Sequence, residues 1–176
     1  MIALRSNNSE FIKYLIIIMS QLELKQYKTD ELNQPFLIDL DYKANLIKIN
    51  VLGLEKKKIQ LPCRIIKIIE EIEMISKDFY FKIENLFFFP LTQELTTLNK
   101  NISVKLNYIH NKILAEMLIN QIGVAKIDLY KTVWSNDKEI LINKLDTHIT
   151  NLKNIINDKF NQKIIFESQH GIIKIK

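Results

Sequence analysis

Hydrophobic and polar residues alternate with a period of two in two neighbouring segments, 36–41 and 47–51. A polar turn at 42–45 separates the two segments. Alternation of this kind around a polar turn is typical of a β-hairpin with one buried face. The pattern therefore predicts an antiparallel hairpin, whose second strand breaks at Gly53 and resumes at 58–61.

Two other segments repeat their apolar residues every three to four positions, as an amphipathic helix does. The first begins at Pro62, whose missing N–H costs nothing in a first helical turn, and ends near 76–78. Its apolar face consists of Ile65, Ile68, Ile69, Ile72 and Ile75. The second and longer helix has an apolar face of Leu141, Leu145, Ile149, Leu152, Ile156 and Phe160. Asn136 and Glu139 have the spacing of a capping box and predict where this helix begins.

Shorter alternating segments predict further strands at 79–83 and 102–108, and a closing hairpin of 163–166 with 172–175. Residues 86–90 are either a continuation of the strand at 79–83 or a buried loop. Residues 112–122 fit a strand, and they also fit a helix that Gly123 would end. The strand is favoured, because residues 124–134 alternate as well.

These elements predict an α+β fold: a mainly antiparallel sheet with one short helix and one long C-terminal amphipathic helix packed on it. The order of elements over about Leu46–Phe160 resembles the helix-grip (START-like) arrangement, and the tail from Lys163 departs from it. That resemblance implies a curved sheet around the last helix and an apolar cavity between them.

The chain contains neither internal repeats nor a linker rich in Pro, Gly or Ser, which predicts a single α+β domain over 19–176. Residues 1–18 are interpreted as an N-terminal extension, because Met19 could itself be the true start. No stretch approaches the roughly 20 apolar residues that cross a bilayer, so no transmembrane segment is expected.

Composition adds a hypothesis about origin. Ile, Lys and Asn occur 32, 23 and 17 times among 176 residues, whereas Arg occurs only at Arg5 and Arg64. AT-rich codons specify the first three residue types, which suggests an AT-rich genome, such as that of an organelle or a reduced bacterium. The net charge of +5 permits a nucleic-acid partner, but the lysines are interspersed with acidic residues and form no long basic block.

Cys63 is the single cysteine, so an intrachain disulfide is impossible. A reducing compartment is therefore expected: the cytoplasm or an organelle interior such as the plastid stroma.

Motifs for catalysis are scarce, and the chain is expected not to be an enzyme. The three glycines, Gly53, Gly123 and Gly171, are too far apart for a phosphate-binding loop, so no cofactor is expected. Asp39 and Asp41 share one face of a strand and could bind a divalent cation, together with the Glu-x-Lys spacing at 23–25. A solvated hairpin face is the favoured interpretation of this pair.

Three residues are candidates for contact with a ligand or a partner: Phe88, Trp134 and His148. Phe88 belongs to the densest aromatic cluster, Trp134 is the single tryptophan, and His148 lies at the edge of the long helix's apolar face. The three histidines have no metal-ligand spacing, so no metal site is expected.

The leading hypothesis is a small non-enzymatic binding protein that holds an apolar ligand or a partner protein between sheet and helix. The alternative is a basic accessory protein on RNA or a ribonucleoprotein. A metal-dependent hydrolase using Asp39 and Asp41 is the third hypothesis.

Overall fold

The computed structural model describes residues 2–5, 13, 26–27, 36–41, 45–51, 54–135 and 137–176. Contacts divide the chain into two compact units, Met1–Phe79 and Tyr80–Lys176. No proline, glycine or serine lies at the division, so composition carried no signal for it. Whether residues 19–176 form one domain, as the sequence suggests, stays a prediction.

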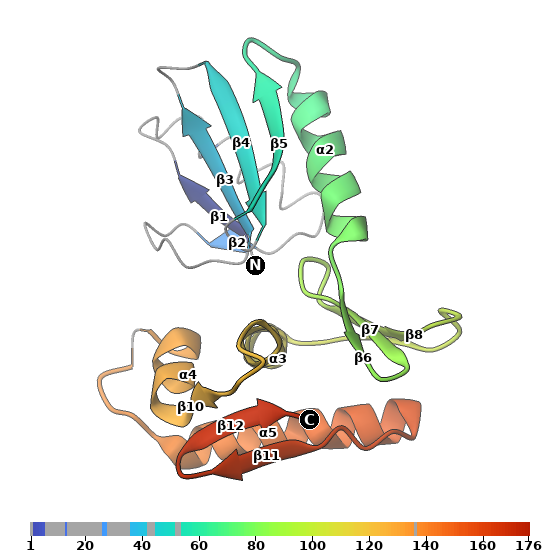
Figure 1. The fold of residues 1–176 in the computed structure, drawn as a ribbon, viewed down its shortest axis with the longest axis vertical. Helices are drawn as coiled ribbons and strands as arrows, with labels where there is room; N and C mark the ends of the chain where they lie inside the picture. Colours follow the sequence, from blue (N-terminus) through green and yellow to red (C-terminus); the bar gives the residue numbers. More distant parts are fainter. Residues whose placement is uncertain are drawn as a thin grey trace. The chain divides into compact units, whose positions relative to one another are not determined.

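The first unit contains a five-stranded sheet with the strand order β2-β1-β3-β4-β5 (Figure 1). Its strands are Ile2–Arg5 (β1), Gln26–Tyr27 (β2), Phe36–Asp41 (β3), Leu46–Val51 (β4) and Leu54–Gln60 (β5). β3 and β4 pair antiparallel from Phe36↔Val51 to Asp41↔Leu46, which confirms the predicted hairpin. β1 belongs to the segment interpreted as an extension, and it pairs in parallel with β2 and β3.

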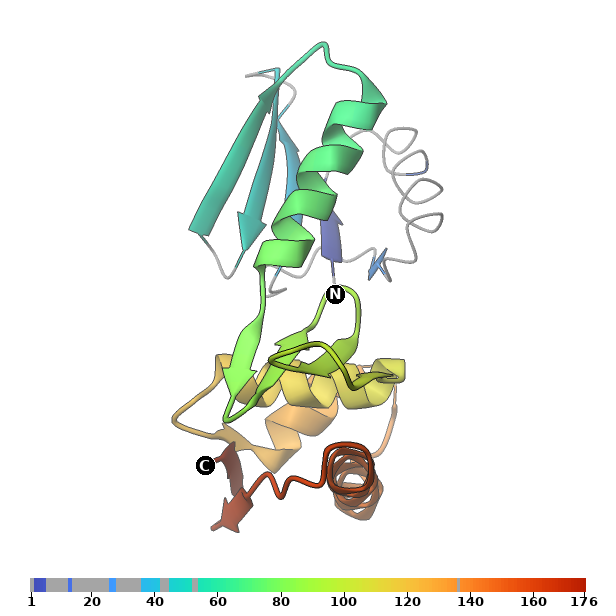
Figure 2. The same cartoon turned by 90° about the vertical axis from the view of Figure 1, so that its right-hand side faces the viewer.

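Helix α2 (Ile65–Asp78) lies beside β5 (Figures 1 and 2). Ile68 and Ile72 on its inner face are buried, as the predicted periodicity requires. Lys57 on β5 lies 2.9 Å from the carboxylate of Glu71, which ties the strand to the helix. The helix begins at Ile65, so Pro62 precedes its first turn instead of opening it.

The second unit begins with a four-stranded antiparallel sheet in the order β6-β7-β8-β9. Its strands are Phe81–Ile83, Leu86–Phe89, Glu94–Thr97 and Ser103–Lys105. The sequence left residues 86–90 as either a continuation of the preceding strand or a buried loop. The structure shows instead a separate strand there, β7, which pairs with both β6 and β8. β8 has no counterpart in the sequence prediction, because adjacent Leu95 and Thr96 are both buried and the alternation is lost.

Three helices follow, and each contacts the other two: α3 (Tyr108–Ile119), α4 (Lys126–Val133) and α5 (Ile142–Phe160). The favoured strand at 112–122 is wrong, because that segment lies in α3 and the turn after it. Residues 110–115 are all buried, and a helix enclosed on every side shows no 3.6-residue period. The alternation at 124–134 was also misleading, since only Val124–Ala125 (β10) is a strand there.

Helix α5 confirms the predicted long amphipathic helix and corrects its start. Its buried residues are Leu145, Ile149, Leu152, Ile156 and Phe160. Leu141 is 52% exposed, because it occupies the N-cap position instead of the apolar face. Glu139 precedes the helix by three residues and therefore cannot complete a capping box, and Asn136 lies outside the described residues.

The chain closes with the predicted hairpin, β11 (Phe166–Gln169) and β12 (Ile172–Ile175), whose first strand begins three residues later than expected. Its turn is His170-Gly171, where both residues have positive φ. β12 also pairs with β10, which gives a three-stranded sheet, β10-β12-β11.

The α+β class is confirmed, and the described strands pair antiparallel except at β1. Those strands form three sheets instead of one curved sheet around the last helix, so the helix-grip order is not reproduced. In the part of the chain that the structure describes, no helix is long and apolar enough to cross a membrane.

Candidate functional site

All three predicted contact residues belong to the second unit; two of them meet, and the third lies in another part of it. Trp134 follows α4 and His148 lies on α5, and their ring centroids are 5.3 Å apart. Phe88 on β7 is fully buried and stacks on Phe81 with centroids 6.3 Å apart. Its place is therefore in the core of the sheet.

His148 also contacts His110, a residue 38 positions away whose proximity the sequence did not indicate. His148 Nδ1 lies 3.5 Å from His110 Nε2. Asn107, the N-cap of α3, accepts a hydrogen bond from the His110 backbone N–H and places its own Nδ2 3.1 Å from His110 Nδ1. Asn107 therefore donates to Nδ1, which leaves the His110 proton on Nε2, directed at His148.

Both imidazoles have lowered pKa values. Burial lowers the pKa of His110, and the neighbouring His148 lowers it further. Burial also lowers the pKa of His148, with a further contribution from the charge of Lys144. The shifts favour the neutral form of both rings, which contact each other between α3 and α5.

A second group of contacts fixes the connection between α4 and α5. Asp137 accepts hydrogen bonds from the Tyr130 hydroxyl at 2.6 Å and from Lys144 Nζ at 2.8 Å. Lys144 Nζ also lies 4.5 Å from the centre of the Trp134 ring. Because of these bonds, the pKa of Asp137 is lowered and that of Tyr130 is raised. The start of α5 is thus tied to the end of α4 through side chains.

The opposite side of α5 is exposed and polar, and we call these residues the outer face of α5. They recur every three or four positions, which places them along one side of the helix. The outer face consists of Asn143, Thr147, Thr150, Asn151, Asn154, Asn157 and Asp158. No described residue makes a hydrogen bond to any of the four asparagine amides.

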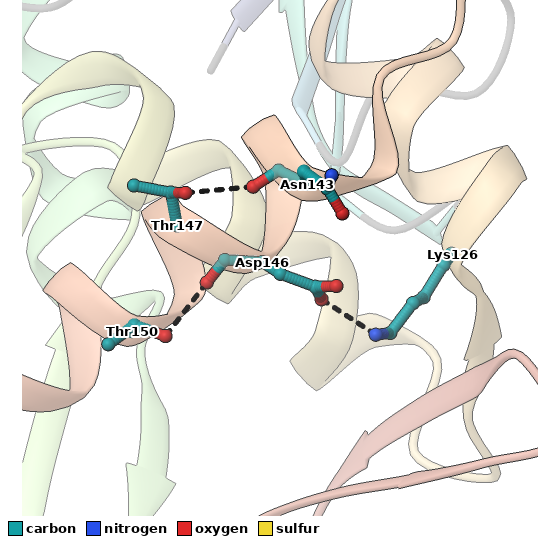
Figure 3. Close-up of polar contacts among 5 residues, drawn as sticks. All are labelled: Lys126, Asn143, Asp146, Thr147 and Thr150. Carbon is teal, nitrogen blue, oxygen red and sulfur yellow. Dashed lines mark hydrogen bonds and ion pairs between the residues drawn. The ribbon is translucent and has the colours of Figure 1, made fainter.

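Figure 3 shows the N-terminal half of this face. The Thr147 hydroxyl donates to the Asn143 carbonyl at 2.8 Å, and the Thr150 hydroxyl donates to the Asp146 carbonyl at 2.9 Å. The hydroxyl protons are therefore used within the helix, which leaves each threonine its methyl group and its oxygen lone pairs for an outside contact. Beside them, Lys126 at the start of α4 lies 2.6 Å from the Asp146 carboxylate, which neutralises that aspartate.

Positive charge is concentrated in this unit. Residues 80–176 contain thirteen lysines and nine acidic residues, so they contribute +4 of the net charge of +5. Lys159, in the last turn of α5, and Lys163, after it, are exposed. The unit has no arginine, because Arg5 and Arg64 both belong to the first unit.

The hairpin β11–β12 lies beside α5 (Figures 1 and 2). Lys153 on α5 places its Nζ 5.2 Å from the centre of the Phe166 ring on β11, which links the two elements. Lys174 and Lys176 on the hairpin pair with Glu167 at 3.3 and 3.0 Å. A hairpin whose turn, His170-Gly171, is exposed thus packs beside α5.

The other candidate residues are not brought together. β3 carries Asp39 and Asp41, whose side chains lie outside the described part of the structure, as do residues 23–25. Among the described residues, no three His, Cys, Asp or Glu side chains converge on a common point that could hold a metal ion. Cys63 is half-buried beside the start of α2.

Comparisons with known proteins found neither a matching family model nor a matching curated protein. Several solved structures match, and two of them have TM-scores of 0.46 and 0.45. The first, described as belonging to "a novel family of redox sensors in the streptococci evolved from two-component response regulators", is 11% identical and matches 100% of this chain and 99% of that one. The second, a mutant of RitR, is 12% identical and matches 99% of this chain and 98% of that one.

Proposed function

We propose that the second unit, Tyr80–Lys176, binds double-stranded DNA through the outer face of α5. The observation that carries the proposal is that the two sides of α5 differ in burial and in residue type. One side is buried against α3 and α4, and the other is an exposed row of threonines and of asparagines whose amides bond to no described residue. Exposed polar side chains with free donors and acceptors are what a base-reading helix requires.

The surrounding elements support the proposal. Three mutually packed helices followed by a β-hairpin are typical of winged helix-turn-helix domains, in which the last helix enters the major groove. α5 has 19 residues and is therefore about 28 Å long, and the major groove, about 12 Å wide, admits such a helix. The connection 134–141 is longer than a simple helix-turn-helix turn, and Asp137 and Trp134 hold it in place.

Charge complementarity also favours DNA. The unit carries most of the net positive charge of the chain, and Lys159 and Lys163 can reach phosphates beside the helix. Duplex DNA is favoured over the RNA of our sequence-based alternative, because the major groove of an RNA helix is too deep and narrow for side chains to read.

The test is fluorescence anisotropy of the full chain with a labelled mixed-sequence DNA duplex of about two helical turns. We expect binding that weakens at least about tenfold between about 50 and about 200 mM salt. Asn154→Glu should weaken it further by about tenfold, because a carboxylate would face the phosphates. Asn101→Glu is the matched control, since it adds the same charge at an exposed turn between β8 and β9.

Failure to bind DNA, or equal losses with Asn154→Glu and Asn101→Glu, would contradict the proposal. Tighter binding to an RNA duplex would favour the RNA alternative. The hypothesis of an apolar ligand between sheet and helix stays a prediction, and a discrete adduct in native mass spectrometry would support it.

A further inference from the structure

The chemistry of the outer face indicates which base pairs it reads, an inference that rests on the proposed function. In the major groove, the amide of asparagine matches the N6 donor and N7 acceptor of adenine, and apolar groups contact the methyl of thymine. The outer face offers four asparagine amides and two threonine methyls. Both groups favour A·T pairs.

Near the middle of α5, the groups that read G·C pairs are absent or engaged. Guanine is most often read by the fork of an arginine, and residues 80–176 contain none. Two of the three lysines of α5 have partners: Lys144 donates to Asp137, and Lys153 lies over the Phe166 ring. The third, Lys159, is exposed in the last turn of the helix. Asp146, which could accept from cytosine, is paired with Lys126, which leaves Asp158 in the last turn.

The AT-biased composition does not by itself explain the asparagines. Asparagine makes up 17 of 176 residues in the chain but four of the 19 residues in α5, although it is a weak helix former. Helix α2 shares the same bias and is also amphipathic, yet it contains no asparagine and exposes Lys67, Glu70 and Lys77. The outer face of α5 thus differs from an ordinary solvated face of the same chain.

We infer that the outer face of α5 selects A·T base pairs through the major groove, with Asn151 and Asn154 at its centre as adenine readers. Both lie near the middle of the helix, so they face the groove when the helix is centred in it. The preference is a property of hydrogen-bond pattern, and it is distinct from a preference for a narrow minor groove, which A·T pairs also favour.

The experiment compares three duplexes of equal length in the anisotropy assay: one of A·T pairs in irregular order, one with each A·T replaced by inosine·cytosine, and one of G·C pairs. An inosine·cytosine pair keeps the minor-groove pattern of A·T but presents the major-groove pattern of G·C. We expect the full chain to bind the A·T duplex at least about tenfold more tightly than the other two. Asn154→Ala should reduce that ratio, whereas Asn101→Ala should leave it unchanged.

Each outcome decides a different point. Equal binding to the A·T and inosine·cytosine duplexes, with weaker binding to G·C, would overturn major-groove reading in favour of the minor groove. Equal affinity for all three would overturn the inference and leave the proposed DNA binding intact. Failure to bind any of them would refute the proposed function itself.

Discussion

Replacing Asn151 and Asn154 together with alanine should make the protein more stable and weaken its binding to DNA. Both side chains are exposed in the middle of α5, and neither amide bonds to a described residue. The substitution therefore removes no internal contact from the described structure, and only the helix propensity changes. A residue that lowers stability while it contacts nothing inside the protein is typical of a functional site.

The magnitude follows from propensity. In a helix interior asparagine is about 0.5–0.7 kcal/mol less favourable than alanine, so the two substitutions should add about 1 kcal/mol to the free energy of unfolding. For a chain of this size, that gain raises the melting temperature by about 2–4 °C. The same variant should lose at least about tenfold in affinity for the A·T duplex, because two amide contacts are removed.

Differential scanning calorimetry and the anisotropy assay would measure the two effects on one preparation. Asn101→Ala is the control, because its position is exposed but not helical and should change neither quantity. A lower melting temperature for the double variant would refute the reasoning, since it would show that the amides hold the fold. A higher melting temperature with unchanged affinity would show that the outer face does not touch DNA.

Three further predictions concern stability. Leu152→Ala removes a fully buried side chain from the inner face of α5 and should lower the free energy of unfolding by about 2–5 kcal/mol in urea denaturation. Gly123→Ala should lower it by more than about 1 kcal/mol, because φ is +122° and the new Cβ would lie 2.7 Å from Ile172 Cγ2; a melting temperature equal to that of the unchanged protein would contradict this. Melting temperatures measured at a series of pH values should fall below about pH 6.5, because His110 and His148 have lowered pKa values in the folded state and the unfolded chain takes up their protons first. His148→Gln should flatten this pH dependence, and an unchanged slope would refute the role of the pair.

Much of the fold could be predicted where burial is one-sided. Strand β4 and the helices α2 and α5 each bury one face, so their apolar residues recur with the period of the element. α3 lacked such a signal, because its residues 110–115 are buried all round. The two-residue strand β10 and the eight-residue helix α4 are too short for a period to be distinguished from chance.

The candidate site was predictable only in part. Trp134 and His148 were predicted to contact a ligand or a partner, which stays a prediction, and the structure shows that they contact each other. His110, which contacts His148, is 38 positions away from it, a separation that no local pattern bridges. Asn151 and Asn154 lie opposite the apolar face of the predicted helix, and the periodicity alone indicates only that such a side is solvated. The residue type was the one feature of the sequence that could have singled out these positions. α5 has asparagine on its exposed side, whereas α2 has lysine and glutamate there.

The two sides of α5 should respond differently to mutation, and this contrast separates positioning from contact. His148, Trp134 and the Lys144–Asp137 pair lie between α5 and the elements that hold it. Their loss should lower stability and DNA affinity together, because a helix that is poorly held cannot present its outer face. Substitutions of the outer-face asparagines remove no side-chain bond to a described residue, so they should lower affinity while stability stays the same or rises. If changes at both sides moved stability and affinity in the same direction, α5 would be acting as a structural helix only.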